Sequence, residues 1–145
     1  MKIAICSSLY FARETKDIAN KLAEKGHKVE IPLYSQKILS GEISFEDFHR
    51  IKERDGDAKF REVAPEDLIK RYFKIIKNCD AILVLNLNKK GIDNYIGGNT
   101  LLEMGFAYVL EKKIFLFNGI PDVGFKDEIK AMKPIVISQN LDKIL

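Results

Sequence analysis

The segment from Asn94 to Ala107 (NYIGGNTLLEMGFA) holds the residues best able to do chemistry. Gly97 and Gly98 lack side chains, so the backbone there can come close to a ligand. The helix predicted to follow them offers unpaired N–H groups and the positive end of its dipole, which together favour anions. Glu103 falls in the predicted first turn of that helix, where the dipole favours an ionised carboxylate. An ionised carboxylate is a nucleophile.

The same residues also have a purely structural interpretation. Thr100 and Glu103 have the spacing of a capping box, in which two side chains satisfy backbone N–H groups at the start of a helix. Capping boxes are common and nucleophilic glutamates are rare. Taken alone, these two residues therefore favour the structural interpretation.

The residues on either side favour the chemical interpretation. The run Asn99 to Ala107 (NTLLEMGFA) is followed by Lys112-Lys113 and then by the apolar run Ile114 to Phe117 (IFLF). An Asn78-Cys79-Asp80 turn precedes the predicted strand at 81–87. In order and spacing, this part of the chain resembles the nucleoside 2-deoxyribosyltransferases and their N-glycosidase relatives. Those proteins carry a small-residue loop and then a helix of the form Gly-Thr-x-x-Glu-(Leu/Met)-Gly-(Tyr/Phe)-Ala.

The resemblance implies a double displacement at the N-glycosidic bond of a (2′-deoxy)nucleoside or a nucleoside 5′-monophosphate. Glu103 would attack C1′ of the sugar while the base leaves, and a second base or water would then attack the glycosyl-enzyme with net retention. The carboxylate would also stabilise an oxocarbenium-like transition state. No cofactor is implied, and the sequence contains no spacing of cysteines and histidines typical of a metal site. Relatives assemble as homodimers or larger homo-oligomers, in which a neighbouring subunit completes the site.

The chain departs from the family pattern at two points, and these departures support an alternative. The family often has an acidic residue five or six positions before the glutamate, where this chain has Gly97 and Gly98. Asp93 or Asn94 would have to take its place. Some transferases also orient the nucleophile with a tyrosine in the first strand, a role left here to Tyr10 or Tyr95. The alternative function is a nucleotide-binding or sensing module that kept the fold and lost the chemistry.

The other candidate residues follow predicted strands. Ser7 and Ser8 would bind a 5′-phosphate or simply form a strand-to-helix turn, and Asn86 and Asn88 would contact sugar hydroxyls or form a loop. Asn118 ends the next strand and would reach the site or only turn the chain. The full predicted substrate-binding set is Ser7, Ser8, Tyr10, Asn86, Asn88, Tyr95, Gly97, Gly98, Asn99, Thr100 and Asn118.

Strands and helices alternate along the chain, which predicts an α/β fold. Short apolar runs predict strands at 2–6, 28–32, 81–87, 114–117 and 135–137, and helical periodicity covers 13–25, 65–77, 99–111 and 125–132. This pattern predicts a flavodoxin-like three-layer sandwich with a parallel sheet in the order 2-1-3-4-5. Its ligand would lie between the first and third strands, where the loops at 7–8 and 86–99 meet. Residues 33–64 form an irregular insertion with a helix start near Ser44, and are a candidate lid or dimer contact.

Composition narrows the classes of protein. A length of 145 residues with 46% hydrophobic residues predicts a single domain over 1–145. The net charge of +3 is spread evenly, which argues against a nucleic-acid polymer as partner. There is no apolar run long enough for a membrane span and no signal-peptide pattern, so we expect a cytoplasmic protein. A flavin-binding redox protein is a weaker alternative, because the first loop lacks the Ser/Thr/Gly-rich phosphate-binding sequence.

Overall fold

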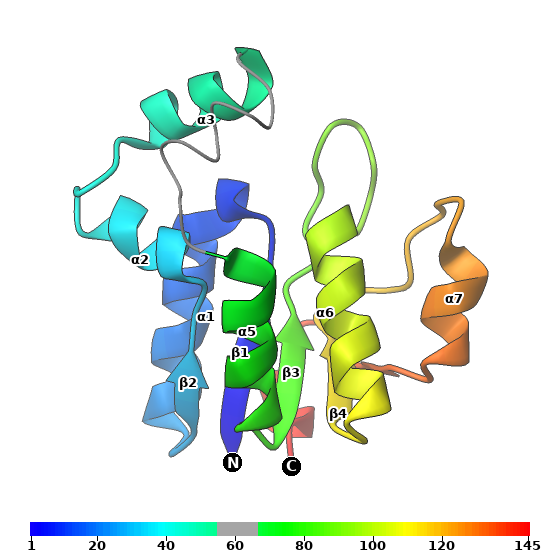
Figure 1. The fold of residues 1–145 in the computed structure, drawn as a ribbon. Coiled ribbons are helices and arrows are strands. Elements are labelled where there is room, and N and C mark those ends of the chain that lie inside the picture. Colours follow the sequence, from blue (N-terminus) through cyan, green and yellow to red (C-terminus); the bar gives the residue numbers. More distant parts are fainter. Residues whose placement is uncertain (55–66) are drawn as a thin grey trace.

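The computed structural model describes residues 1–54 and 67–145. Five parallel strands form one sheet in the order β2-β1-β3-β4-β5, as Figure 1 shows in part. This order and the α/β class confirm the predicted flavodoxin-like topology. The strands are β1 (Lys2–Cys6), β2 (Lys28–Glu30), β3 (Ala81–Val84), β4 (Lys113–Leu116) and β5 (Ile135–Val136).

The side chains of alternate residues in the central strands pack into two separate hydrophobic cores, one on each face of the sheet. Cys6 and Val84 belong to a cluster with Tyr72 and Met104. Ile5, its β3 partner Leu83 and Leu85, which directly follows β3, belong to a second cluster with Ile18 and Leu22. Since side chains alternate between faces along a strand, apolar residues at successive positions require cover on both faces.

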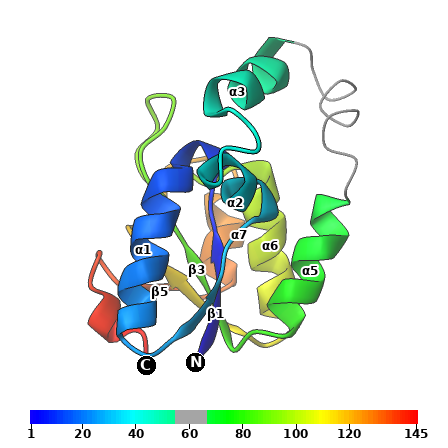
Figure 2. The same cartoon turned by 90° about the vertical axis from the view of Figure 1, so that its left-hand side faces the viewer.

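Helices supply that cover. Helix α1 (Ala12–Glu24) lies on one face, and α5 (Leu68–Lys77) and α6 (Gly98–Val109) lie side by side on the other (Figure 2). Helix α7 (Lys126–Ala131) adds Ile129 to the core on the α5–α6 side, and the short 3-10 helix η2 (Leu141–Lys143) adds Leu141 to the opposite core. The predicted helices at 13–25, 99–111 and 125–132 are thus present with ends shifted by one or two residues.

The insertion after β2 begins with a helix that the sequence pattern did not predict. Helix α2 (Leu33–Leu39) starts directly after Pro32, and Tyr34 in its first turn is buried against Phe48 of α3 (Phe45–Arg54). Burial of an aromatic side chain outweighs the weak local helical signal. Figure 1 shows α2 and α3 beyond the carboxyl ends of β1 and β3. The predicted helix start at Pro65 lies outside the described residues.

Two loops meet at the carboxyl ends of the central strands. The loop after β1 contains Ser7 and Ser8 and continues into the short 3-10 helix η1 (Leu9–Phe11), where Ser8 Oγ accepts a hydrogen bond from the N–H of Tyr10. The loop after β3 runs to Gly97 and leads into α6. Among the helices of the described residues, none has the length and apolar character needed to cross a membrane.

Candidate active site

Glu103 lies in the second turn of α6, one turn later than the sequence pattern predicts. The helix starts at Gly98, with Gly97 in the N-cap position, so its first turn contains no acidic residue. The predicted capping box is therefore wrong, because Thr100 already lies inside the helix and no side chain caps Gly97. The Glu103 side chain is available for another role.

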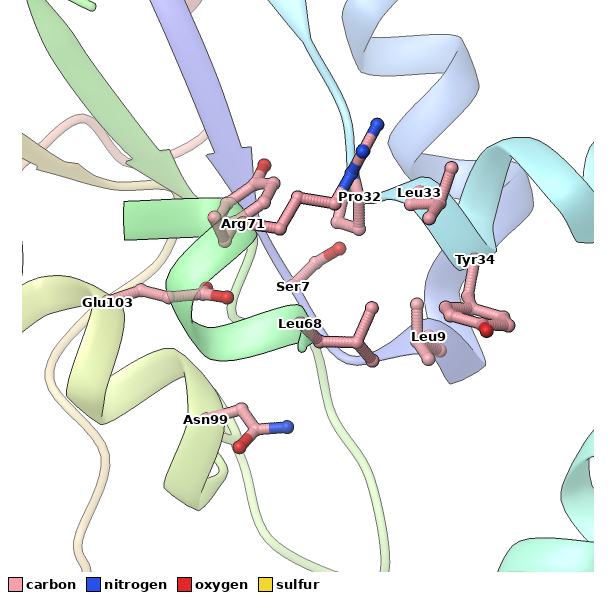
Figure 3. A pocket seen from close by; sticks show the side chains of 10 residues that line it. Ser7, Leu9, Pro32, Leu33, Tyr34, Leu68, Arg71, Asn99 and Glu103 are labelled. Carbon is pink, nitrogen blue, oxygen red and sulfur yellow. The ribbon is translucent and has the colours of Figure 1, made fainter. Parts of the chain in front are cut away.

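That side chain reaches into a cavity between α6, α5 and the α2 region (Figure 3). The cavity has an empty volume of about 470 Å³ and is partly open to solvent. Most of its wall is apolar, and Ser7, Arg71, Asn99 and Glu103 supply its polar groups. The complete lining is Ser7, Leu9, Pro32, Leu33, Tyr34, Leu68, Arg71, Tyr72, Asn99 and Glu103. Among the described residues that form this wall, Glu103 is the one carboxylate.

Burial controls the charge of Glu103. Loss of water around the carboxyl group raises its pKa from 4.5 to about 8, and a hydrogen bond with Cys6 lowers it only in part. The sequence-based prediction, that the helix dipole favours the ionised form, is therefore wrong in direction. The dipole acts mainly within the first turn, whereas desolvation acts wherever the carboxyl group is enclosed. At neutral pH Glu103 is therefore mostly protonated.

Two further buried groups lie next to Glu103. Cys6 is the last residue of β1 and has no exposed surface, and its thiol pairs with the Glu103 carboxyl group. The Tyr72 hydroxyl donates a hydrogen bond to the carbonyl oxygen of Ile5 in the same strand. Burial raises the pKa of the Tyr72 phenol, with added contributions from Cys6 and Glu103. The tyrosine beside the candidate nucleophile is thus Tyr72, a residue that sequence analysis did not single out.

A second, more polar cavity adjoins the first. Its empty volume is about 460 Å³, and Ser7, Leu9 and Asn99 line both cavities. Ser7 is held by a hydrogen bond of 2.8 Å between its Oγ and Oγ1 of the buried Thr15. The lining of this second cavity is Ser7, Ser8, Leu9, Lys89, Tyr95, Gly97, Gly98, Asn99 and Thr100. Seven of the predicted substrate-binding residues therefore lie around one space: Ser7, Ser8, Tyr95, Gly97, Gly98, Asn99 and Thr100.

The absence of a side chain at Gly97 has a local explanation. A Cβ atom there would lie 3.2 Å from the Tyr95 hydroxyl oxygen and 3.3 Å from Cε1 of the same ring. A larger residue would push Tyr95 away from the start of α6. Gly97 therefore allows the tyrosine ring to form part of the wall of the polar cavity.

The predicted asparagines lie elsewhere. Asn86 is fully buried, where its Oδ1 accepts from the N–H of Asn118 at 2.9 Å and its Nδ2 donates to the carbonyl of Gly119 at 2.8 Å. The Asn118 side chain donates in return to the carbonyl of Asn86. Asn88 accepts a hydrogen bond from the N–H of Asn94. The structure does not bring these predicted residues to the walls of the two cavities. Asn86 and Asn118 join the loops after β3 and β4, and Asn88 stabilises the loop after β3.

Tyr10 also lies outside both walls. Its ring is about half exposed and packs edge-on against Phe11, with centroids 5.4 Å apart. Asp93, offered as a replacement for the upstream acid, is exposed and borders neither cavity. The cavities instead contain two cationic residues that sequence analysis did not select, Arg71 and Lys89. Lys89 lies in the loop after β3, directly after Asn88. Its place in a loop that was already predicted to meet the ligand was the signal available in the sequence.

Comparison with known proteins agrees with this fold. No protein-family model matches the chain, and no curated protein sequence matches it. Among solved structures it is similar to a CMP N-glycosidase of Clostridium botulinum, BcmB. The two chains are 16% identical, the alignment covers 99% of this chain and 98% of that one, and the TM-score is 0.50. At this identity the similarity shows a shared fold.

Proposed function

We propose that this protein cleaves or transfers the N-glycosidic bond of a (2′-deoxy)nucleoside or nucleotide, with Glu103 as nucleophile. The observation that carries the proposal is the position of Glu103, the one carboxyl group among the described residues that line a cavity beside the carboxyl ends of β1 and β3. Ligands of open α/β sheets bind at this edge. The shared fold with an N-glycosidase and the resemblance around Glu103 support the same assignment.

The apolar wall of the first cavity is a suitable place for a nucleobase. Leu9, Leu33 and Leu68 offer apolar contacts to a flat ring, and Tyr34 adds an aromatic side chain. The Arg71 guanidinium, which extends from α5 beside this wall (Figure 3), offers N–H donors to a base that gains negative charge as it leaves. The sugar would then lie between this wall and Ser7, with C1′ facing Glu103.

The reaction has two steps. The carboxylate of Glu103 forms a bond to C1′ as the bond between C1′ and the base nitrogen breaks, and the leaving base takes up a proton from the solvent. Water or a second base then attacks C1′ from the vacated side and gives up a proton to the solvent, releasing Glu103 as a carboxylate. Among the described residues that line the two cavities, Glu103 is the one carboxylate. This is consistent with a covalent intermediate, because an inverting mechanism uses a second carboxylate to activate water.

The raised pKa of Glu103 means that substrate must bind to the minority ionised form or promote ionisation. Positive charge that develops on the sugar ring favours the carboxylate in the transition state. A protonated carboxyl group also favours the competing function, in which the chain binds a nucleotide without reaction. The two functions make different predictions for product formation.

Assays over a substrate panel distinguish these functions. The panel contains the four deoxynucleosides, the four ribonucleosides and their 5′-monophosphates, each with and without a second free base. We expect free base from at least one member, detected by chromatography, and a new nucleoside or nucleotide if the enzyme is a transferase. Thermal stabilisation by a panel member without any product would support the binding module instead. Neither product nor stabilisation would contradict both functions.

We also propose that a second copy of the chain packs beside the site. Ile69 and Leu102 are about half exposed and line a cavity of about 240 Å³ between α5 and α6, which Glu103 also lines. Val109, farther along α6, is 79% exposed. Apolar residues this exposed on neighbouring helices are typical of an interface. Light scattering of the wild type is expected to give twice the mass of one chain. The Val109→Glu variant is expected to give the mass of a single chain. A monomeric wild type would contradict the proposal.

A further inference from the structure

The carbonyl groups of β1 point alternately toward its two neighbouring strands. On the β3 side, the carbonyl of Cys6 accepts a hydrogen bond of 2.9 Å from the N–H of Leu85. On the β2 side, the carbonyl of Met1 accepts one of 3.0 Å from the N–H of Lys28. Such bonds recur at every second residue of a parallel pair. The last carbonyl of β1 that faces β2 is therefore that of Ile5.

The residue that would complete this ladder is a proline. The register of the two strands places Ala4 beside Glu30, so the N–H expected to reach the Ile5 carbonyl belongs to position 32. That position is Pro32, which has no N–H. Strand β2 accordingly ends at Glu30, and the chain turns at Pro32 into α2. The Ile5 carbonyl needs a donor from outside the sheet, because a buried carbonyl without a partner costs free energy.

Tyr72 of α5 supplies this donor. Its hydroxyl group donates a hydrogen bond to the carbonyl oxygen of Ile5. Both residues are enclosed, since Tyr72 is 5% exposed and Ile5 has no exposed surface. Tyr72 and Pro32 also line the cavity that Glu103 enters. The break in the ladder and the bond that compensates for it are therefore part of the candidate active site.

This bond lies one residue away from the contact that Glu103 makes with β1. Cys6 directly follows Ile5, and its buried thiol pairs with the Glu103 carboxyl group. Because a planar peptide group joins the two residues, a displacement of the Ile5 carbonyl also displaces Cys6. The Tyr72 hydroxyl has one proton, which it donates to Ile5. Tyr72 thus acts on Glu103 through the end of β1 and not by donating to its carboxyl group.

We propose that Tyr72 is a positioning residue: its hydroxyl group replaces the N–H that Pro32 lacks and fixes the end of β1, so that Cys6 orients the Glu103 carboxyl group. The inference rests on the proposed function, in which this carboxyl group attacks C1′. The proline ends the pairing of β2 where the cavity begins, and Tyr72 restores the restraint that a ladder bond would have given.

The first test compares Tyr72→Phe with a matched control, Tyr108→Phe. Each substitution removes one hydroxyl group and keeps the ring, but Tyr108 is half-exposed on α6 and lines neither cavity. We expect Tyr72→Phe to lower kcat by about 10- to 50-fold with KM within about threefold, because a misplacement of about 1 Å can cost about 100-fold in rate. Tyr108→Phe is expected to leave kcat within about twofold. An unchanged kcat in Tyr72→Phe, or an increase in KM alone, would overturn the inference.

Pro32→Ala tests whether Tyr72 acts through the Ile5 carbonyl. Pro32 has an extended backbone, with φ −55° and ψ 141°, which alanine also adopts. Alanine at this position supplies the missing N–H. In the Pro32→Ala background, Tyr72→Phe is therefore expected to lower kcat by less than about threefold, since two substitutions at one hydrogen-bond acceptor are not additive. A loss of the same size in both backgrounds would show that Tyr72 does not replace the ladder bond.

Titration of the Glu103 carboxyl group by carbon-13 NMR needs no substrate. The hydrogen bond with Cys6 lowers the pKa of Glu103, so we expect Tyr72→Phe to raise this pKa above the wild-type value. The same substitution is expected to leave the pKa unchanged when Cys6→Ala is already present. Arg71, the other charged side chain among the described residues of this cavity wall, is present in every variant.

The outcomes of this titration separate the inference from the proposed reaction. A Glu103 pKa that does not rise in Tyr72→Phe, or that rises equally with and without Cys6, would overturn the positioning role. If the pKa rises only with Cys6 present, but the wild type releases no base from any substrate, the proposed function fails and the positioning of the carboxyl group stands.

Discussion

Replacement of Glu103 by glutamine is expected to lower kcat by at least about 1,000-fold, because the amide cannot form the glycosyl-enzyme and no second carboxylate lines the described walls of the two cavities. Glutamine preserves the shape of the side chain and is neutral like the protonated carboxyl group. Ligand binding should therefore change little. The measurement is the initial rate of base release with the best substrate of the panel, at a pH near 8.

Glu128→Gln is the matched control for this substitution. Glu128 is an exposed glutamate in α7, away from the cavities, so its replacement tests for an effect of lost negative charge alone. Intact-mass spectrometry of the quenched reaction is expected to show the added sugar or sugar phosphate on the wild type and on Glu128→Gln. Normal turnover by Glu103→Gln, or an adduct on that variant, would show that another residue is the nucleophile.

The second large effect is expected in the pH dependence. Because the nucleophile must be ionised and its pKa is about 8, kcat/KM is expected to rise about tenfold per pH unit below that value and to level off above it. The increase should be about 50-fold between about pH 6 and pH 8, and about 100-fold between pH 6 and the plateau above pH 8. A general acid with the same pKa would produce the opposite profile, with activity falling above pH 8. The direction of the profile therefore decides between the two roles of Glu103.

Substitutions at Cys6 test whether the observed midpoint belongs to Glu103. The hydrogen bond from Cys6 lowers the pKa of the Glu103 carboxyl group. Loss of that donor in Cys6→Ala is expected to move the midpoint of the profile upward. Cys6→Ser is expected to move it downward, since a hydroxyl is a stronger donor than a thiol. A midpoint that is the same in all three proteins would assign the titration to another group.

Protein stability gives an independent measure of the same pKa. An unfolded Glu103 ionises near its ordinary value of 4.5, whereas the folded carboxyl group keeps its proton up to about pH 8. The unfolded state therefore binds fewer protons between these values, and the carboxyl group destabilises the fold increasingly as the pH rises through this range. Glu103→Gln is expected to melt at a higher temperature than the wild type, by a margin that grows from about pH 5 to pH 8 and is constant above it. An equal margin at every pH would contradict the raised pKa.

The strand order could be predicted from the sequence because it depends on local patterns of apolar residues that repeat along the chain. The apolar runs at 2–6, 81–87 and 114–117 and the helices between them require a parallel sheet covered on both faces. The loop with Gly97 and Gly98 and the glutamate after it were likewise visible, since they lie close together in the chain. The helix α2 was not predicted, because burial of Tyr34 against Phe48 depends on a contact between separate helices.

The sequence by itself thus determined the topology of the sheet, which depends on short-range patterns, and its resemblance to the N-glycosidase relatives selected Glu103 as the candidate nucleophile. Only the tertiary structure decided the charge of that nucleophile, because the burial that raises the pKa of Glu103 comes from parts of the chain far from it in sequence. It also decided the neighbours: Cys6 and Tyr72 lie beside Glu103, Lys89 lies on Ser8, and Asn86 is enclosed in the loops after β3 and β4. These contacts join residues more than 30 positions apart, and no spacing along the chain specifies them.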